Sequence, residues 1–329
     1  MIQAFRTEVD IQPFPFNIGY ETPIIFCGSC FTENIGRIMV ERKMPALVNP
    51  FGVVYNPLSV KLVVERIIQA KPFTEFDLRF RDGLWYSYLH HSSYSSSDKD
   101  KCLKTINSDL AQANEFVKKA NCLLITFGTA RVYYLKEDNQ PVANCHKVPS
   151  REFNNKLMSV EEIVTSWSEL IDVILDKTPW WKVIFTISPV RHWKDGAVGN
   201  QQSKSILNVA IHELILKYPD NAFYFPSYEI LMDDLRDYRY YADDMLHPSK
   251  VAVEYIWDKF KKSLVEPKSI VLMEEIEKII SAVNHKPFNP NTFEHKAFIT
   301  NTLELIKKIK KKNSSLNFTE EENTLLGFL

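Results

Sequence analysis

Four short apolar runs, separated by longer segments with helical periodicity, constrain the fold of this chain most. The runs cover residues 24–27, 122–127, 183–187 and 222–225. Nearly continuous apolar strands that alternate with helices are typical of a parallel sheet covered on both faces. We therefore predict an α/β fold with a mostly parallel central sheet and a layer of helices on each side.

Several of the helical segments carry recognisable start signals. Asn56 and Pro57 suit the N-cap and the first position of a helix predicted over residues 57–70. Ser159-x-x-Glu162 is a capping box that opens a helix ending at about residue 175. Apolar residues at 207, 210, 211 and 214 form the stripe of another helix, and a last core helix follows Pro248.

Two regions lie outside this alternation. The aromatic segment around Asp82-Gly83 has the pattern of a β-hairpin and forms an insertion of about residues 71–98 that could overhang the sheet as a lid. Beyond residue 267 the strand signals end, and amphipathic helices are predicted over 269–283 and 293–312. The closing segment, 313–329, is predicted to be partly disordered. We expect a domain over residues 1–266 and a helical C-terminal extension over 267–329.

The overall composition excludes some classes of protein. The 40 basic and 41 acidic residues give a formal net charge of −1, which disfavours a nucleic-acid partner. No apolar stretch has the roughly 20 residues needed to span a membrane, and the first residues lack the pattern of a signal peptide. We therefore expect a cytoplasmic protein. The five cysteines are odd in number and scattered, so no disulfide framework is expected.

The first apolar run ends at Gly28-Ser29-Cys30, just before a helical segment over residues 31–39. Glycine permits a sharp exit from a strand, and a helix N-terminus stabilises negative charge and lowers the pKa of a thiol. Either Ser29 or Cys30 could therefore act as a nucleophile, and the alternative is a simple glycine turn. The Cys27-x-x-Cys30 spacing also permits a redox function, although Cys27 should point into the sheet.

A second motif, Asp244-x-x-His247, precedes the last core helix. A carboxylate near a histidine can orient the imidazole, fix its tautomer and stabilise the imidazolium. The alternative is an acidic residue that caps the helix beside an unrelated histidine. Together with the Gly-Ser-Cys turn, the motif indicates acyl-transfer chemistry.

These two motifs resemble those of the SGNH (GDS-type) hydrolases, and the string Gly28-Ser29-Cys30-Phe31-Thr32 resembles more closely the GSCFA family, with Thr32 in place of the final alanine. The resemblance extends over about residues 24–260. It also rests on the stretches 49–57, 127–133, 144–147, 188–192 and 244–247. It implies a flavodoxin-like three-layer α/β/α sandwich.

The SGNH resemblance also implies roles for individual residues. Cys30 matches the nucleophile and is favoured over Ser29, His247 matches the general base and Asp244 its orienting partner. The oxyanion hole would use the backbone N–H groups of Cys30 and Gly52. At the position of the usual side-chain donor stands Ala130, which cannot donate, and losing such a donor typically costs about 2.7–4 kcal/mol.

Other polar residues are candidates to replace that donor or to bind substrate. Arg131, Asn144 and His146 are the candidate replacements. Arg191 and His192 directly follow a predicted strand, at the edge where open α/β sheets bind ligands, and Arg191 could bind a carboxylate or phosphate. No histidine or cysteine spacing typical of a metal site occurs, so neither a metal nor another cofactor is expected.

The sequence thus predicts an enzyme, an SGNH-type hydrolase or acyltransferase that acts on an ester or thioester, possibly an O-acyl carbohydrate, through a covalent acyl intermediate. The alternative is a catalytically retired scaffold that binds a small anionic ligand. The acyl group, the acceptor and the oligomeric state are not determined by the sequence.

Overall fold

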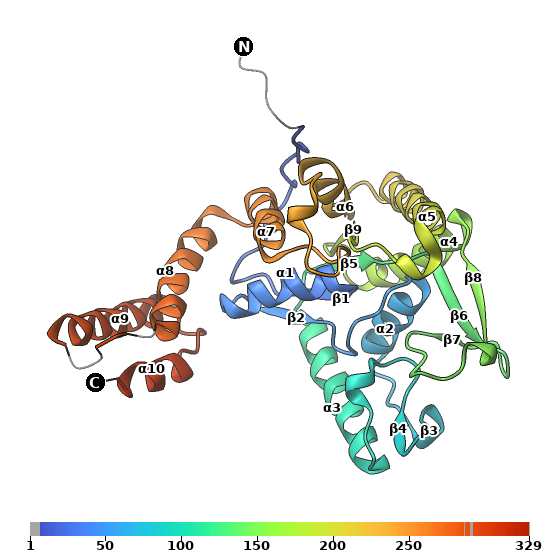
Figure 1. Ribbon diagram of the computed structural model, residues 1–329, viewed down its shortest axis with the longest axis horizontal. Helices are drawn as coiled ribbons and strands as arrows, with labels where there is room; N and C mark the ends of the chain where they lie inside the picture. Colours follow the sequence, from blue (N-terminus) through green and yellow to red (C-terminus); the bar gives the residue numbers. More distant parts are fainter. Residues whose placement is uncertain (1–6, 286, 290–291, 329) are drawn as a thin grey trace.

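The centre of the fold is a five-stranded sheet in which every neighbouring pair of strands is parallel (Figure 1). The computed structural model describes residues 7–285, 287–289 and 292–328. The strand order is β10-β9-β5-β1-β2, which in chain order is the 2-1-3-4-5 arrangement of flavodoxin-like folds. The strands are β1 (Ile24–Gly28), β2 (Ala46–Val48), β5 (Cys122–Phe127), β9 (Lys182–Ile187) and β10 (Ala222–Tyr224).

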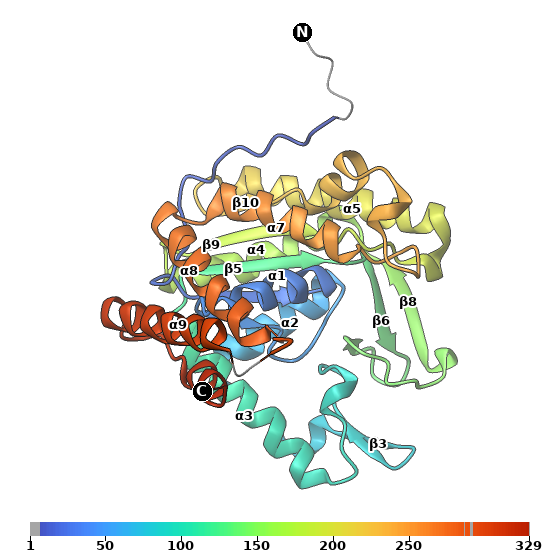
Figure 2. The ribbon, with the colours of Figure 1, turned by 60° about the vertical axis from the view of Figure 1, so that its left-hand side comes forward.

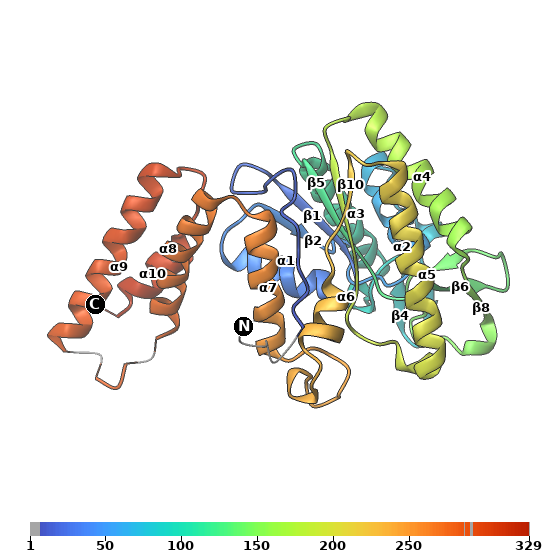
Figure 3. The same ribbon diagram turned by 90° about the horizontal axis from the view of Figure 1, so that it is seen from above.

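Helices cover both faces of this sheet and make a three-layer α/β/α sandwich, as predicted (Figure 3). Successive side chains of β1 point to opposite faces of the sheet, so each face has its own apolar cluster. Ile25 and Cys27 join the cluster on one face, whereas Ile24 and Phe26 join the cluster on the other. The first face packs against α2 (Pro57–Gln69), α4 (Val160–Lys177) and α5 (Gly196–Lys217), and the second against α1 (Cys30–Glu41) and α7 (Lys250–Leu264).

The start signals of two helices are confirmed. Asn56 caps α2 by accepting the Ser59 N–H at 2.8 Å, and Ser159 and Glu162 form the predicted capping box of α4. The last core helix follows Pro248, as predicted, and begins at Lys250 with Ser249 as its N-cap.

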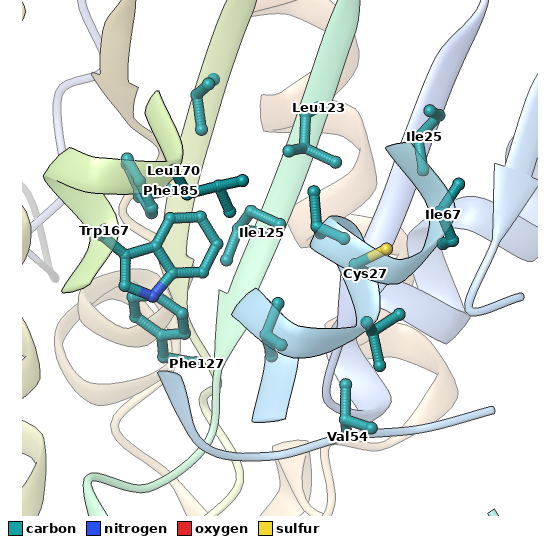
Figure 4. Packing of buried hydrophobic residues seen from close by; sticks show 14 of the residues in the cluster. Ile25, Cys27, Val54, Ile67, Leu123, Ile125, Phe127, Trp167, Leu170 and Phe185 are labelled. Atoms are coloured by element: carbon teal, nitrogen blue, oxygen red, sulfur yellow. The ribbon is translucent and has the colours of Figure 1, made fainter. Parts of the chain in front are cut away.

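The larger cluster is organised around Trp167 of α4 (Figure 4). Its ring lies 5.2 Å from that of Phe127 and 5.3 Å from that of Phe185, both in edge-to-face geometry. Its indole N–H donates to the Pro57 carbonyl at 3.1 Å. This contact ties α4 to the start of α2 on the same face of the sheet.

The predicted hairpin is confirmed: β3 (Arg79–Arg81) and β4 (Leu84–Tyr86) are antiparallel. Asp82 and Gly83 have φ values of 49° and 80°, the positive values that a two-residue type I′ turn requires. The hairpin belongs to an insertion that also contains the short helices η1 (Glu75–Asp77) and η2 (Ser92–Tyr94) and leads into α3 (Lys99–Val117).

A second small sheet was not predicted. It has the antiparallel order β7-β6-β8 and its own apolar cluster of Leu135, Val142 and Phe153. Figure 2 shows it beside the hairpin insertion, beyond the carboxyl edge of the central sheet. The strands are β6 (Arg131–Leu135), β7 (Pro141–Val142) and β8 (Phe153–Leu157), with η3 (Ser150–Glu152) before the last.

At the same edge, Lys204 of α5 holds two loops together. The side chain is fully buried, and its ammonium donates to the carbonyl oxygens of Gly128 and Ser188, both at 2.7 Å. These two residues directly follow β5 and β9. Burial lowers the pKa of Lys204 to about 7. The elements that complete this edge are η4 (Trp193–Asp195), α6 (Ser227–Glu229), the π-helical turn η5 (Ile230–Asp234) and η6 (Tyr238–Tyr240).

The C-terminal helices α8 (Pro267–Asn284), α9 (Phe293–Lys312) and α10 (Thr319–Leu326) form a separate apolar cluster (Figure 1). Ion pairs from Arg42 to Glu277 at 2.5 Å and from Lys43 to Glu321 at 2.7 Å join it to the α/β unit. The prediction of partial disorder after residue 312 is wrong for α10, because Phe318 and Leu325 are buried in this cluster. Residue 329 lies outside the described residues.

Among residues 7–285, 287–289 and 292–328, no helix combines the length and the apolar composition needed to cross a bilayer.

Candidate functional site

The candidate nucleophiles lie at the sharp turn between β1 and α1. Gly28 has a φ of 144°, and a side chain there would place its Cβ 2.3 Å from the Thr126 carbonyl oxygen. Its N–H donates to the Asn49 side-chain oxygen at 2.9 Å. Only glycine therefore fits this position, and the turn delivers Ser29 as the N-cap and Cys30 as the first residue of α1.

The two candidate nucleophiles differ in accessibility. Ser29 is only 1% exposed, and its hydroxyl oxygen is buried with no hydrogen-bond partner among the described residues. Cys30 is half-buried and lines a cavity of about 740 Å³. Because Cys30 is the first residue of α1, its N–H has no carbonyl partner within the helix. A substrate can therefore reach the thiol but not the hydroxyl.

Three parts of the chain form the walls of this cavity: the first turns of α1, the loop after β2, and the insertion. The loop contributes Asn49, Gly52 and Tyr55, and the insertion contributes His91. A side chain at Gly52 would place its Cβ 2.2 Å from the Cβ of His91, so glycine lets the insertion pack closely against the loop. The insertion thus forms one wall of the cavity that contains the thiol.

The Cys30 thiol is protonated at neutral pH. Burial raises its pKa above the ordinary value, and a hydrogen bond with the Tyr55 hydroxyl partly opposes this effect. Burial also raises the pKa of Tyr55 to about 12, so the phenol is a poor base. A nucleophilic role for Cys30 therefore requires another group that takes its proton.

His91 shares the cavity with Cys30, yet its hydrogen bonds favour a donor role. Its Nδ1 accepts the Ser93 N–H at 3.3 Å and lies 3.1 Å from the Ser93 hydroxyl. A neutral imidazole whose Nδ1 accepts carries its proton on Nε2. In this tautomer His91 presents an N–H group rather than a basic nitrogen.

His247 has the opposite tautomer. Its Nδ1 lies 2.5 Å from Oδ2 of Asp244, so Nδ1 carries the proton and Nε2 is left basic. Asp244 also accepts the backbone N–H groups of His247 and Leu246, both at 2.9 Å. These hydrogen bonds lower the pKa of Asp244 to about 2. The predicted pairing of Asp244 with His247 is present in the structure.

The dyad and the thiol lie in separate parts of the carboxyl edge. Within residues 7–285, which include both side chains, no hydrogen bond joins Cys30 to His247. Asp244 lines a second cavity of about 530 Å³, together with Arg191, Arg236, Trp193 and Tyr241. His247 itself is exposed, on the loop between η6 and α7.

The remaining predicted residues have other contacts. The N–H of Gly52 donates to the Asn49 carbonyl at 2.7 Å, so it is not free to bind an oxyanion. Arg131 forms an ion pair with Asp195 at 3.4 Å. His192 is half-buried, burial lowers its pKa, and its backbone N–H donates to the side-chain oxygen of Asn200 at 2.9 Å.

Asn144 and His146 fasten the insertion to the second small sheet. His146 Nε2 lies 2.9 Å from the Ser87 carbonyl oxygen and 3.0 Å from that of His90, and its ring stacks on Tyr86 at 4.3 Å. The side-chain oxygen of Asn144 accepts the His146 N–H at 2.9 Å. Among the described residues that line the cavity around Cys30, neither Asn144 nor His146 occurs.

Asn49, Tyr55 and His91 were not among the predicted site residues. Asn49 and Tyr55 lie in the 49–57 stretch, which was noted only as a family motif, and Tyr55 has no sequence pattern that would indicate a role. His91 follows the hairpin by several residues, and only the packing against Gly52 brings it to the cavity.

A profile of the GSCFA family matches residues 23–260, which contain both cavities and the whole central sheet. The chain belongs to the GSCFA family. A second profile, described as the C-terminal domain of GSCFA domain proteins, matches residues 276–327, which fall within the helical cluster of α8 to α10. No curated protein matches this GSCFA protein.

Proposed function

We propose that this GSCFA protein is an acyl-transfer enzyme, a hydrolase or acyltransferase that acts on an ester or thioester through an acyl intermediate on Cys30. The observation that carries the proposal is the accessible thiol at the start of α1, beside a cavity of about 740 Å³. The Asp244–His247 dyad at the same sheet edge supports it. The resemblance of both motifs to those of SGNH hydrolases is consistent with this chemistry.

In the proposed first step, Cys30 Sγ attacks the acyl carbonyl carbon. The S–C bond forms, the thiol proton passes to Nε2 of His247, and the carbonyl electron pair moves onto oxygen. When the carbonyl re-forms, the bond to the leaving group breaks and the imidazolium returns the proton to that group. Water or an acceptor hydroxyl then attacks the thioester and gives its proton to His247. The C–S bond breaks, the acyl product leaves, and the imidazolium returns the proton to Cys30 Sγ.

The proposed first step needs His247 closer to Cys30 than it lies in this structure. Catalytic hydrogen bonds are often long before substrate binds and tighten in the complex. His247 is exposed on a loop whose ends are fixed by the Ala242 N–H donating to the His247 carbonyl at 2.7 Å and by the pairing of Tyr241 with Pro248.

The nucleophile can be tested with p-nitrophenyl acetate. We expect wild type and Ser29→Ala to give a burst of p-nitrophenolate and an acetyl group on Cys30, located by peptide mass mapping. Cys30→Ala should give neither. Ser29→Ala is tolerated because the hydroxyl it removes is buried without a partner. Cys145→Ala, which removes another partly buried thiol, is the matched control and should behave as wild type.

Equal bursts from wild type and Cys30→Ala would contradict the proposed mechanism. Loss of the burst in Ser29→Ala alone, with the fold intact by circular dichroism, would assign the reaction to the hydroxyl instead.

A second candidate function is the binding of a small anion without turnover. The second cavity favours it, because Arg191 and Arg236 both line it without a carboxylate partner among the described residues. The acidic residues of that cavity are engaged elsewhere: Asp237 pairs with Arg239, and Asp244 with His247. Two unpaired guanidinium groups beside aromatic rings suit a carboxylate or phosphate on a ring-containing ligand.

Calorimetric titration with inorganic phosphate and with benzoate tests this second function. We expect Arg191→Gln to weaken anion binding about tenfold or more, since a charge-assisted hydrogen bond contributes roughly 1.5–3 kcal/mol. Arg151→Gln, on an exposed arginine that pairs with Glu152 outside this cavity, should leave the affinity unchanged. Anion binding that is equally weak in wild type and Arg191→Gln would remove this candidate.

A further inference from the structure

The proposed acyl transfer needs a side-chain donor for the oxyanion, and the segment after β5 does not supply one. Ala130 is buried, and its N–H donates to the Ser203 hydroxyl at 2.7 Å. The Thr129 hydroxyl lies 3.1 Å from that same Ser203 oxygen and accepts the Arg131 N–H at 3.1 Å. These polar groups therefore serve the packing of α5 and not the cavity around Cys30.

Asn49 is held in one orientation by three hydrogen bonds. Its N–H donates to the Phe26 carbonyl at 2.8 Å, and its carbonyl accepts the Gly52 N–H at 2.7 Å. Its side-chain oxygen accepts the Gly28 N–H at 2.9 Å. Because the atom that faces the Gly28 N–H must accept a hydrogen bond, it is Oδ1, and the other amide atom, Nδ2, points away from Gly28.

The backbone of Asn49 also restricts the residue type. Its φ is 43°, in the left-handed region that asparagine tolerates better than most other residues with a side chain. Asparagine thus satisfies the turn after β2 and at the same time brings a carboxamide to the base of the Gly28-Ser29-Cys30 turn.

Among the described residues, the carboxamide nitrogen is the one polar group of Asn49 that lacks a partner. Nδ2 is buried and has no hydrogen bond among the described residues, although buried donors are nearly always paired in folded proteins. Asn49 lines the same cavity as Cys30. The wall of the cavity therefore brings together a thiol, the N–H of Cys30, which has no carbonyl partner within α1, and an unpaired amide donor fixed to the same turn.

We propose that Nδ2 of Asn49 is the side-chain donor of the oxyanion hole, acting with the backbone N–H of Cys30. This inference rests on the proposed function and assigns a catalytic residue to it. As Cys30 Sγ bonds to the acyl carbon, the negative charge that develops on the carbonyl oxygen is bound by these two N–H groups. Asn49 thereby replaces the donor that is missing at Ala130 and at the engaged N–H of Gly52.

The test compares two reactions of the same thiol. Acylation by p-nitrophenyl acetate passes through an oxyanion, whereas alkylation by iodoacetamide does not. Asn49→Asp keeps an oxygen to accept the Gly28 N–H but loses the donor. Since the added carboxylate raises the thiol pKa, both rates are compared at their high-pH plateaus. We expect acylation to fall about 100-fold, as for other oxyanion donors, and alkylation to change less than about threefold.

Two further variants make the result decisive. Asn155→Asp makes the same chemical change on exposed β8 and should affect neither reaction. Asn49→Ala removes the donor without adding charge, so it replaces Asn49→Asp if that variant is unfolded by circular dichroism. Equal effects on acylation and alkylation would overturn the role of Asn49 alone. A wild-type protein that is alkylated but never acylated would overturn the proposed function, and the role of Asn49 with it.

Discussion

Replacing His247 by alanine should slow the acylation of Cys30 by about 10²–10⁴-fold, the usual contribution of a general base. The thiol is protonated at neutral pH because burial raises its pKa, so a base must remove its proton as the S–C bond forms. The measurement is the burst rate with p-nitrophenyl acetate between pH 6 and about pH 10. The difference in burst rate between wild type and His247→Ala should become smaller as the pH rises, because hydroxide then ionises the thiol directly.

Two companion variants identify the base. Asp244→Asn should also slow acylation. In wild type, Oδ2 of Asp244 lies 2.5 Å from Nδ1 of His247 and favours the tautomer with the proton on Nδ1, whereas an amide does not favour this tautomer. His91→Ala should have a smaller effect, since Nδ1 of His91 accepts the Ser93 N–H and its basic lone pair is occupied. A large loss in His91→Ala together with a normal rate in His247→Ala would move the role of base to the histidine that shares the cavity with Cys30.

Replacing Gly28 by alanine should lower the free energy of unfolding by about 3 kcal/mol or more. The φ of 144° alone costs roughly 1–3 kcal/mol for a residue with a side chain. In addition, the new Cβ would lie 2.3 Å from the Thr126 carbonyl oxygen, which belongs to β5 and cannot move without disturbing the sheet. Urea unfolding followed by circular dichroism measures the change.

Gly83→Ala is the matched control for this prediction. Gly83 has a φ of 80° at the tip of the hairpin, and nothing lies within 4 Å of a Cβ placed there. Gly83→Ala should therefore lower the free energy of unfolding by about 1 kcal/mol, which reflects the backbone conformation alone. If Gly28→Ala were no more destabilising than Gly83→Ala, the close contact between β1 and β5 would not restrict the turn.

Much of the fold was predictable because local patterns are sufficient for it. The apolar runs at 122–127 and 183–187 are too continuous for a half-exposed strand, and both are central strands of the sheet. The hairpin followed from Asp82-Gly83. The second small sheet was missed because β7 has only two residues, and β8 exposes Asn154, Asn155 and Lys156, so neither has the apolar content of a buried strand.

The site was predictable only where its residues are close in sequence. Asp244 and His247 are three positions apart on one loop, and they form the predicted pair. Asn49 reaches the turn at Gly28 through the register of β1 with β2, which no local pattern specifies. Arg131 and His146 contact Asp195 and the Ser87 carbonyl, and no local pattern predicts these partners because they lie far away in the sequence.

The order of the strands has a consequence for the protein as it is synthesised. Cys30 and Asn49 lie in the first two strand-to-helix connections, whereas His247 enters with the last, just before α7. A nascent chain therefore carries the thiol and the proposed oxyanion donor long before it has a base. An unburied thiol has a pKa of about 8.5, so without a base the thiol of the nascent chain should stay mostly protonated during that interval. Reactivity would begin only when the chain is long enough to close the sandwich, so that folding itself delays the onset of the chemistry.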